Sequence, residues 1–560
     1  IRGGDARHTL VLIDGIRVND PSSTGREFDF SNLALTDIER IEVLRGPQSA
    51  LYGSDAMGGV INIITRRGRG GTRATLSTEV GSYGTKELRG GISGGTDRFF
   101  YAFSATALDT DGFSAYGYRI PRITARLPGP LEADGARLFG FSGRAGVRLS
   151  DTTEIEVGGY ASRNRVAYDA AFGSRPDTPA VSEASLLNGH VRLTHDALDG
   201  AFRNRLTVYG NQTERIARDF AYGFASGALT GITRSGFLGE RRGAEYQGDL
   251  ALGAFGLLTF GAVAEAERAR TDRQTLFPRL GARTLGIDED RVTRSGFAVW
   301  QVSPTDRLHL SLSGRIDDVI GVDRFATWRA TAAYEIRETE TKLRASAGTG
   351  GKAPSLFQLY SSFGNPDLAS ERSVGVDAGV DQTLFDGRLV LSATVFANRY
   401  RNLIDFASSP RCSATQVFGC YVNIARAETS GLELSGDLAV VPQMVRLKVT
   451  YTYLHALDLT TNLRLARRPE NEGRLALVIN PTARLTLEPR LVLVGERFSG
   501  FGETLRLAPY ARLDMLAEYK VDDTFTVFGR VENLADARYE EVATYGTPGR
   551  SFYAGLRATW

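Results

Sequence analysis

The chain has 560 residues, a formal net charge of +2 and 24% charged residues. This near balance of charge gives no reason to expect a nucleic-acid partner. No apolar run reaches the ~18 residues that a membrane-spanning helix needs, which excludes a helical membrane protein but not a transmembrane barrel, whose strands of about 10 residues alternate in polarity.

The first predicted element is a β-hairpin. Two apolar runs, residues 10–13 and 16–18, flank Asp14-Gly15, a dipeptide typical of the type I′ turn between antiparallel strands. The polar residues 19–25 then predict a loop, and the Ile- and Val-rich residues 38–44 and 60–64 predict two further strands. The start of the chain is therefore expected to form a small β unit.

The connection between the last two of these strands is rich in glycine: Gly46-Pro47, Tyr52-Gly53-Ser54 and Gly58-Gly59. Glycine permits turns and close packing, so one interpretation is a compact β unit around which other parts of the chain pack tightly. A phosphate-binding loop is the alternative, but neither GxxxxGK[ST] nor GxGxxG is present.

These residues resemble a known family. Arg45-Gly46-Pro47, Tyr52-Gly53-Ser54 and residues 58–65 are similar to the plug-domain signature of TonB-dependent outer-membrane receptors, and residues 9–19 resemble the hairpin before it. The resemblance implies a plug domain at 1–67, a linker at 68–71 and a transmembrane β-barrel at 72–560. No secretion signal is present and the chain begins inside the pattern, so we expect a plug that is incomplete at its N-terminus.

From Thr72 onward the sequence follows a two-residue period. Residues 308–316, 485–493 and 552–560 alternate apolar or small residues with polar ones, as in strands with one apolar and one polar face. The polar face repeatedly carries Arg, Glu and Asp, which are unfavourable in the core of a sandwich but suit a water-filled lumen. The pattern therefore predicts an outer-membrane barrel.

Connection lengths alternate in the same region. Short turns such as 337–340, 385–388 and 521–523 lie between long loops such as 352–370, 407–420, 495–510 and 535–550. This alternation is typical of an outer-membrane barrel, whereas a β-propeller would need a blade repeat of about 40–50 residues, which we do not find. Allowing about 22 residues for each strand with its connections predicts an all-β fold of roughly 22 antiparallel strands, a size that needs a plug.

Catalytic chemistry has little support in the sequence. There are only five histidines, and both HExxH and the GxSxG nucleophile motif are missing, so we expect a protein that is not an enzyme and requires no cofactor. Cys412 and Cys420 are the only cysteines and fall in one long loop, which favours a disulfide. A metal or redox pair is the alternative.

Later segments also resemble the family. Residues 350–371 are similar to its second signature, and residues 52–56 with 365–368 resemble its vitamin B12 receptors. In those receptors a loop like residues 164–177 contributes calcium-binding aspartates, so the resemblance implies calcium in the extracellular loops, with Asp169 and Asp177 as ligands and Asp219 as a third. Solvated loop acids are the alternative for all three.

The resemblance further implies a monomeric receptor in the bacterial outer membrane, surrounded by outer-membrane lipid, that imports a scarce nutrient with energy from TonB through a segment absent from this chain. We expect the ligand to be a corrinoid such as vitamin B12, or else a ferric siderophore. A passive porin is the alternative from a different functional class, and the expected plug argues against it. The implied ligand contacts, for which ordinary turn residues are the alternative, are Asn19, Asp20, Ser22, Ser23, Thr24, Tyr52, Ser54 and Asp55.

Overall fold

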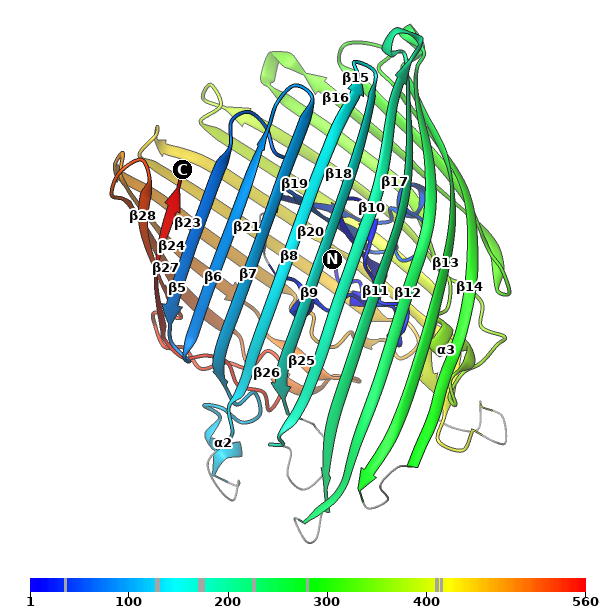
Figure 1. Ribbon diagram of the computed structural model, residues 1–560, viewed down its shortest axis with the longest axis vertical. Coiled ribbons are helices and arrows are strands. Elements are labelled where there is room, and N and C mark those ends of the chain that lie inside the picture. The colour runs from blue at the N-terminus through cyan, green and yellow to red at the C-terminus, as the bar shows by residue number, and fades with distance from the viewer. Residues whose placement is uncertain are drawn as a thin grey trace.

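The computed structural model describes residues 1–34, 38–125, 131–169, 177–223, 228–277, 282–407, 412 and 416–560. Its regular structure is mostly β-strand, arranged as a closed barrel with a small sheet inside the lumen (Figure 1). Among the described residues, no helix is both long enough and apolar enough to cross a membrane. The predicted all-β fold with an N-terminal plug inside a barrel is confirmed.

The inner sheet, which we call the plug sheet, has the strand order β2-β1-β4-β3. Its strands are β1 (Thr9–Ile13), β2 (Ile16–Arg17), β3 (Ile38–Arg45) and β4 (Gly59–Thr65), and the same segment holds the short helices η1 (Ala6–His8), η2 (Phe30–Asn32) and α1 (Ser49–Tyr52). The predicted hairpin joins β1 to β2, with Asp14 and Gly15 at φ of 51° and 84°, as a type I′ turn requires. β1 also pairs in parallel with β4, which places these two strands at the centre of the sheet.

The centre of the plug sheet is buried on both faces, since the barrel wall covers the face that the rest of the plug leaves open, whereas the edge strand β3 is mostly exposed. All five residues of β1 are buried. On one face, Leu10 and Leu12 pack against Ala56 and Val60 of the plug. The other face forms a cluster with the wall that consists of Val11, Ile13, Val18, Phe28, Ile63, Tyr160 and Leu186. The wall is therefore part of the hydrophobic core of the plug.

Within the described residues the wall has 22 antiparallel strands, as predicted, and it closes where β29 pairs with β5. The wall strands are β5 (Arg73–Gly81), β6 (Thr85–Gly95), β7 (Phe99–Phe113), β8 (Asp134–Ser150), β9 (Thr153–Tyr168), β10 (Ala180–Ala197), β11 (Phe202–Tyr222), β12 (Leu229–Ala251), β13 (Leu257–Phe277), β14 (Ala282–Val302), β15 (Leu308–Val319), β16 (Asp323–Ile336), β17 (Thr341–Lys352), β18 (Glu371–Leu384), β19 (Leu389–Ala407), β20 (Cys420–Val441), β21 (Val445–Asp458), β23 (Asn471–Thr482), β24 (Leu485–Val494), β27 (Tyr510–Lys520), β28 (Phe525–Glu532) and β29 (Ser551–Thr559).

The remaining elements lie in the connections between wall strands. The two-residue strand β22 (Leu463–Arg464) pairs with β21, and a separate hairpin is formed by β25 (Arg497–Gly500) and β26 (Thr504–Leu507). The short helices are α2 (Pro121–Thr124), η3 (Leu198–Gly200), η4 (Gly253–Phe255), η5 (Arg337–Thr339) and α3 (Leu356–Tyr360).

The two rims of the barrel differ. Short turns join the strands at one rim, whereas the other rim carries the long connections that hold α2, α3 and the β25–β26 hairpin, at the bottom of Figure 1. We call the second rim the outer rim, because outer-membrane barrels place their long loops outside the cell. Along β13, Glu265 and Glu267 are buried toward the lumen while Ala264 and Ala266 are exposed, so the predicted alternation of polar inner and apolar outer positions is confirmed there.

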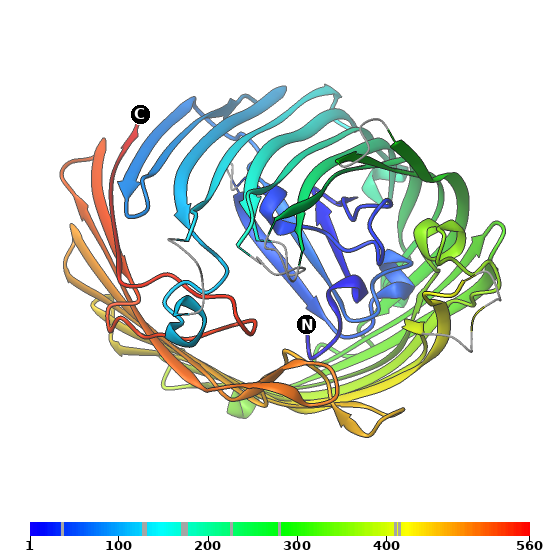
Figure 2. The same cartoon turned by 90° about the horizontal axis from the view of Figure 1, so that it is seen from below.

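The plug sheet lies toward one side of the lumen. Figure 2 shows the plug, in dark blue, close to the green strands, with α2 and the red loop before β29 on the opposite side. Helix α1 contacts β15, β16 and β17, and η2 contacts β9 and β10. One side of the wall therefore positions the plug.

Candidate functional site

Two plug loops lie at the level of the outer rim, and together they form what we call the plug apex, residues 19–26 and 52–55. The Ser355 hydroxyl donates to the carbonyl of Thr24 at 2.7 Å, and Lys352 Nζ donates to the carbonyl of Gly25 at 2.5 Å. The amide of Ala353 donates to Ser54 Oγ at 3.3 Å. Because Lys352 ends β17 at the outer rim, these bonds fix both plug loops at the outer end of the lumen.

Six of the eight predicted ligand contacts are buried in the plug apex. Asn19 is fully buried, and its side chain accepts a hydrogen bond from Val11 N at 2.8 Å and donates to the carbonyls of Thr9 and Arg26 at 3.0 Å. Asp20 accepts from the hydroxyl and amide of Ser22 at 2.6 and 2.8 Å. Asn19, Asp20, Ser22, Ser23, Ser54 and Asp55 thus build the loops, and Thr24 is the exposed member of the eight.

Tyr52, the remaining predicted contact, is half-buried and lines a cavity below the apex. The cavity has a volume of about 530 Å³ and lies between the plug and the wall. Arg17 and Leu51 of the plug line it, together with Glu245 and Arg315 of the wall. Tyr52 therefore faces this cavity, whereas Thr24 is exposed at the apex.

Asp55 is the anion at the centre of the apex. Its carboxylate lies 2.7 Å from Arg26 Nη2, 3.2 Å from Lys352 Nζ and 4.0 Å from Arg17 Nη1. Burial alone would raise the pKa of Asp55, but the three cations outweigh burial and hold it at about 2. Asp20 differs, because burial raises its pKa despite the bonds from Ser22 and the attraction of Arg215.

Buried ion pairs continue from the apex into the wall. Arg26 Nη1 lies 3.3 Å from Glu267 of β13, which also pairs with Arg241 of β12 at 3.0 Å and with Arg291 of β14. Removing one member of such a network would leave a buried charge uncompensated. The network therefore holds the plug apex to β12, β13 and β14.

Four aromatic side chains lie beside the exposed part of the apex, and we call them the aromatic surface: Phe357, Phe363, Phe406 and Tyr421. Phe406 packs edge-to-face on Phe363 at 5.6 Å between ring centroids and on Tyr421 at 5.5 Å. Tyr421 interacts with the side chain of Thr24, and Phe406 is 46% exposed. These residues come from two loops and the strand ends beside them, so no local pattern in the sequence pointed to them.

The two cysteines lie beside this surface. Cys412 and Cys420 are joined as a disulfide, with their Cα atoms 5.6 Å apart. The Gln416 side chain donates to the carbonyl of Gly364 at 2.7 Å, and Tyr421 N donates to the carbonyl of Phe363 at 3.0 Å. These bonds connect the loop after β19 to the loop after β17.

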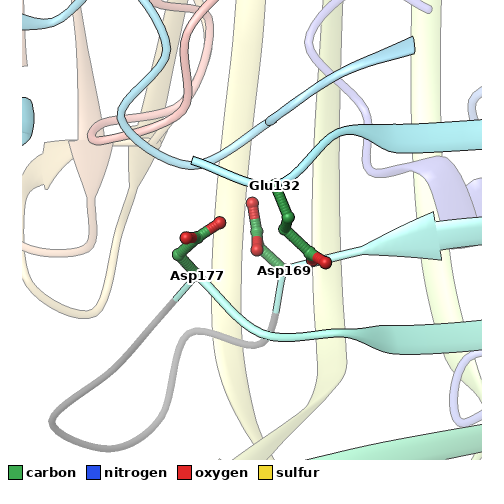
Figure 3. A group of neighbouring side chains, drawn as sticks. All are labelled: Glu132, Asp169 and Asp177. Carbon is green, nitrogen blue, oxygen red and sulfur yellow. The ribbon is translucent and has the colours of Figure 1, made fainter. Parts of the chain in front are cut away.

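Three carboxylates meet in the loops before β8 and between β9 and β10, and Figure 3 shows their side chains gathered at one point. Glu132, Asp169 and Asp177 each present one oxygen, and these oxygens lie within 4.8 Å of one another. Asp169 also accepts hydrogen bonds from Tyr116 N at 2.7 Å and from Thr178 N at 3.0 Å. The arrangement brings oxygen ligands from two loops to one point, which is the donor set that a hard cation such as calcium prefers.

Two of the three predicted calcium ligands are therefore together, and Glu132 is an addition that the sequence did not indicate. Asp219 is not in this group and accepts a hydrogen bond from Tyr168. Residues 170–176 of the predicted calcium loop lie outside the described residues. Glu132 precedes β8 and is distant in sequence from Asp169, so no spacing rule could have joined them.

Comparison with known proteins identifies two matching family models. The model described as TonB dependent receptor-like, beta-barrel matches residues 100–534, and the TonB-dependent Receptor Plug Domain matches residues 1–60. The chain is also 30% identical, over 560 residues, to the vitamin B12 transporter BtuB of Photobacterium profundum, with 99% of this chain and 84% of that protein covered.

Solved structures share the fold. The siderophore receptor PirA from Acinetobacter baumannii superimposes with a TM-score of 0.82 at 19% identity, covering 100% of this chain and 92% of that one. The copper transporter OprC superimposes with a TM-score of 0.84 at 15% identity, covering 100% and 91%. At these identities the likeness concerns the fold alone.

Proposed function

Because this chain belongs to the TonB-dependent receptor family, whose members are outer-membrane transporters and not enzymes, we propose that it imports a corrinoid of the vitamin B12 type. The observation that carries the proposal is the 30% identity to a vitamin B12 transporter along 99% of the chain. Membership also implies a nutrient ligand and interaction with TonB. The plug sheet inside the lumen argues against the alternative of a passive porin.

The side chains at the outer end of the plug suit a large ligand with a flat apolar face. Thr24 is exposed at the plug apex, and Tyr421 and Phe406 stand beside it. Aromatic rings offer contact area and stacking to a macrocycle, while the Thr24 hydroxyl offers a hydrogen bond to its polar edge. We therefore place the first contact of the ligand between Thr24 and the aromatic surface.

We also propose that Glu132, Asp169 and Asp177 bind calcium and that calcium strengthens ligand binding. Three carboxylates held within 4.8 Å repel one another unless a cation or a proton compensates their charge. The Tyr545 hydroxyl donates to the carbonyl of Asp169 at 3.3 Å, so a cation there would order the loop before β29 as well as those before β8 and β10. Such ordering would lower the entropy lost when the loops close on a ligand.

The test is calorimetric titration of the detergent-solubilised chain with cyanocobalamin, first with calcium and then with EGTA. We expect tight binding that weakens about tenfold on chelation, a typical size for coupling between two sites. The double variant D169N/D177N should bind weakly in both conditions, while the control D219N should behave like the unmodified chain. If ferric enterobactin binds and cyanocobalamin gives no heat, the proposed corrinoid ligand is wrong and a siderophore takes its place. If cyanocobalamin binds equally well with calcium and with EGTA, the corrinoid stands and only the proposed role of calcium is wrong.

A further inference from the structure

A row of charged side chains crosses the outside of the barrel near the outer rim. Lys86 of β6 lies opposite Asp109 of β7, Asp109 opposite Arg137 of β8, Arg137 opposite Arg165 of β9, and Arg165 opposite Glu183 of β10. Arg137 and Arg165 are 73% and 57% exposed. Since directly opposed residues in a sheet point to the same face, the row lies on the surface that faces the lipid.

This row is more positive than its own acids can balance. Arg137 pairs with Asp109 at 3.0 Å, whereas Glu183 is shared by Arg165 at 3.6 Å and by Arg163 at 3.8 Å. Arg163 is 77% exposed and lies two residues farther from the outer rim than Arg165, opposite Phe139. Arginine on the lipid face of a barrel is tolerated near the interface and is costly deeper in the bilayer, so Arg163 needs an anion at headgroup depth.

A groove runs along the row, lined by its charged side chains and, on the side toward the middle of the wall, by apolar ones. Its volume is about 710 Å³, and Leu88, Ala107 and Phe139 occupy the positions two residues along from Lys86, Asp109 and Arg137. Leu88 and Phe139 are 52% and 55% exposed. A hydrocarbon chain could lie in this groove with its polar end at the arginines.

We propose that this face binds a phosphorylated, acylated glycolipid of the outer leaflet. Its phosphates would contact Arg137, Arg163 and Arg165, and one acyl chain would lie in the groove beside Leu88 and Phe139. Guanidinium groups bind phosphate through two parallel hydrogen bonds, and the surplus of positive charge favours a lipid with more than one phosphate over a zwitterionic one.

Two comparisons support this occupant. Elsewhere on the outside of the wall several exposed arginines have an acid of their own, as in Arg268 with Asp288 at 2.7 Å and Arg399 with Glu428 at 2.9 Å. A second copy of the chain is the other occupant that could cover a groove, but a two-fold interface would place this positive row close to itself. The charge of the surface therefore favours an anionic lipid.

The test is native mass spectrometry of the detergent-purified chain titrated with diphosphorylated lipid A and, separately, with phosphatidylethanolamine. We expect lipid A to bind about tenfold more tightly, and the triple variant R137A/R163A/R165A to lose that preference, because the charge-assisted bonds to phosphate are removed. The matched control R268A/R324A/R399A changes three exposed arginines elsewhere on the wall and should keep it.

Dephosphorylated lipid A tests the same contact without altering the protein. The proposal can therefore be refuted even if the triple variant does not fold. Loss of the preference on dephosphorylation would support the proposal. Equal binding of the phosphorylated and dephosphorylated lipids would overturn it, as would an unchanged preference in the folded triple variant or a dimer that buries this face.

Discussion

Asp55 illustrates how a single residue couples the plug to the wall. The carboxylate is buried and compensates Arg26, Lys352 and Arg17. We expect D55N to destabilise the plug by about 3 to 5 kcal/mol, because it leaves buried cations without their anion. Hydrogen–deuterium exchange of residues 9–65 should become faster in this variant, whereas the exposed control D367N should leave exchange in that segment unchanged.

Acid should remove the same stabilisation. The pKa of Asp55 is about 2 in the folded protein, below its ordinary value of 3.8, so its contribution is fully present above pH ~4 and is lost as the pH falls toward 2. The exchange difference between the unmodified chain and D55N should therefore shrink over that interval. A difference that stays constant down to pH ~2 would contradict the assigned ion pairs.

At the residue scale, the plug motifs located the loops of the apex but not the ion pairs that hold them. Asp55 follows a recognisable plug motif, and this suggested a ligand contact. Its partners Arg26 and Lys352 are distant in sequence, and only the fold brings their charges to one carboxylate. Glu132 escaped prediction for the same reason, because its neighbours Asp169 and Asp177 follow a different strand.

Helix α3 is the element that joins the outer rim to the plug apex. Ser355 caps it by accepting from Gln358 N at 3.0 Å while donating to the carbonyl of Thr24, and Gln358 completes a capping box. We expect S355A to cost about 1 kcal/mol, the usual loss for an N-cap, and to speed hydrogen exchange in both α3 and the loop at 19–26.

The control for this variant lies at the other end of the same helix. The hydroxyl of Ser361 has no hydrogen-bond partner among the described residues, so S361A should leave both segments unaffected. Faster exchange confined to α3 in S355A would mean that the Thr24 bond contributes nothing to the apex.

Elements with a local cause were predictable from sequence, and elements held by distant contacts were not. Asp14-Gly15 specified its hairpin because few residues adopt two successive positive φ angles. The two-residue period specified the wall strands because one face meets lipid and the other meets water or the plug. The parallel pairing of β1 with β4 has no such local signature, and neither does the aromatic surface.

At the scale of the whole molecule, the plug is expected to keep the lumen closed to small solutes. Deleting residues 1–67 should leave a 22-stranded wall around water, so conductance in planar bilayers should rise strongly. The control is the exposed substitution D367N, which lies outside the plug, keeps it intact and should conduct far less than the deletion. An unchanged conductance after deletion would contradict the assignment of these residues as a plug.

The strand number was predictable because a strand with its connections takes about 22 residues on average, so dividing the barrel segment by that length gives the count. The ligand was not predictable in this way, since it depends on a few side chains brought together at the outer rim. Thr24 comes from the plug, whereas Phe406 and Tyr421 lie on neighbouring strands of the wall, β19 and β20.

The pairing of β29 with β5, which closes the barrel, indicates the order in which the molecule assembles. β29 meets β5 through contacts such as the bond from Phe552 N to Ser82 Oγ, which joins residues 470 positions apart. Closing a loop of that length costs roughly 5 kcal/mol of chain entropy, so this pairing is expected late in folding. Because Tyr160 and Leu186 of the wall complete the core of the plug, the plug can reach its final packing only as the wall curls around it. We therefore expect a chain cut before its last strand to remain an open sheet with an incompletely packed N-terminal segment, exposed to proteases.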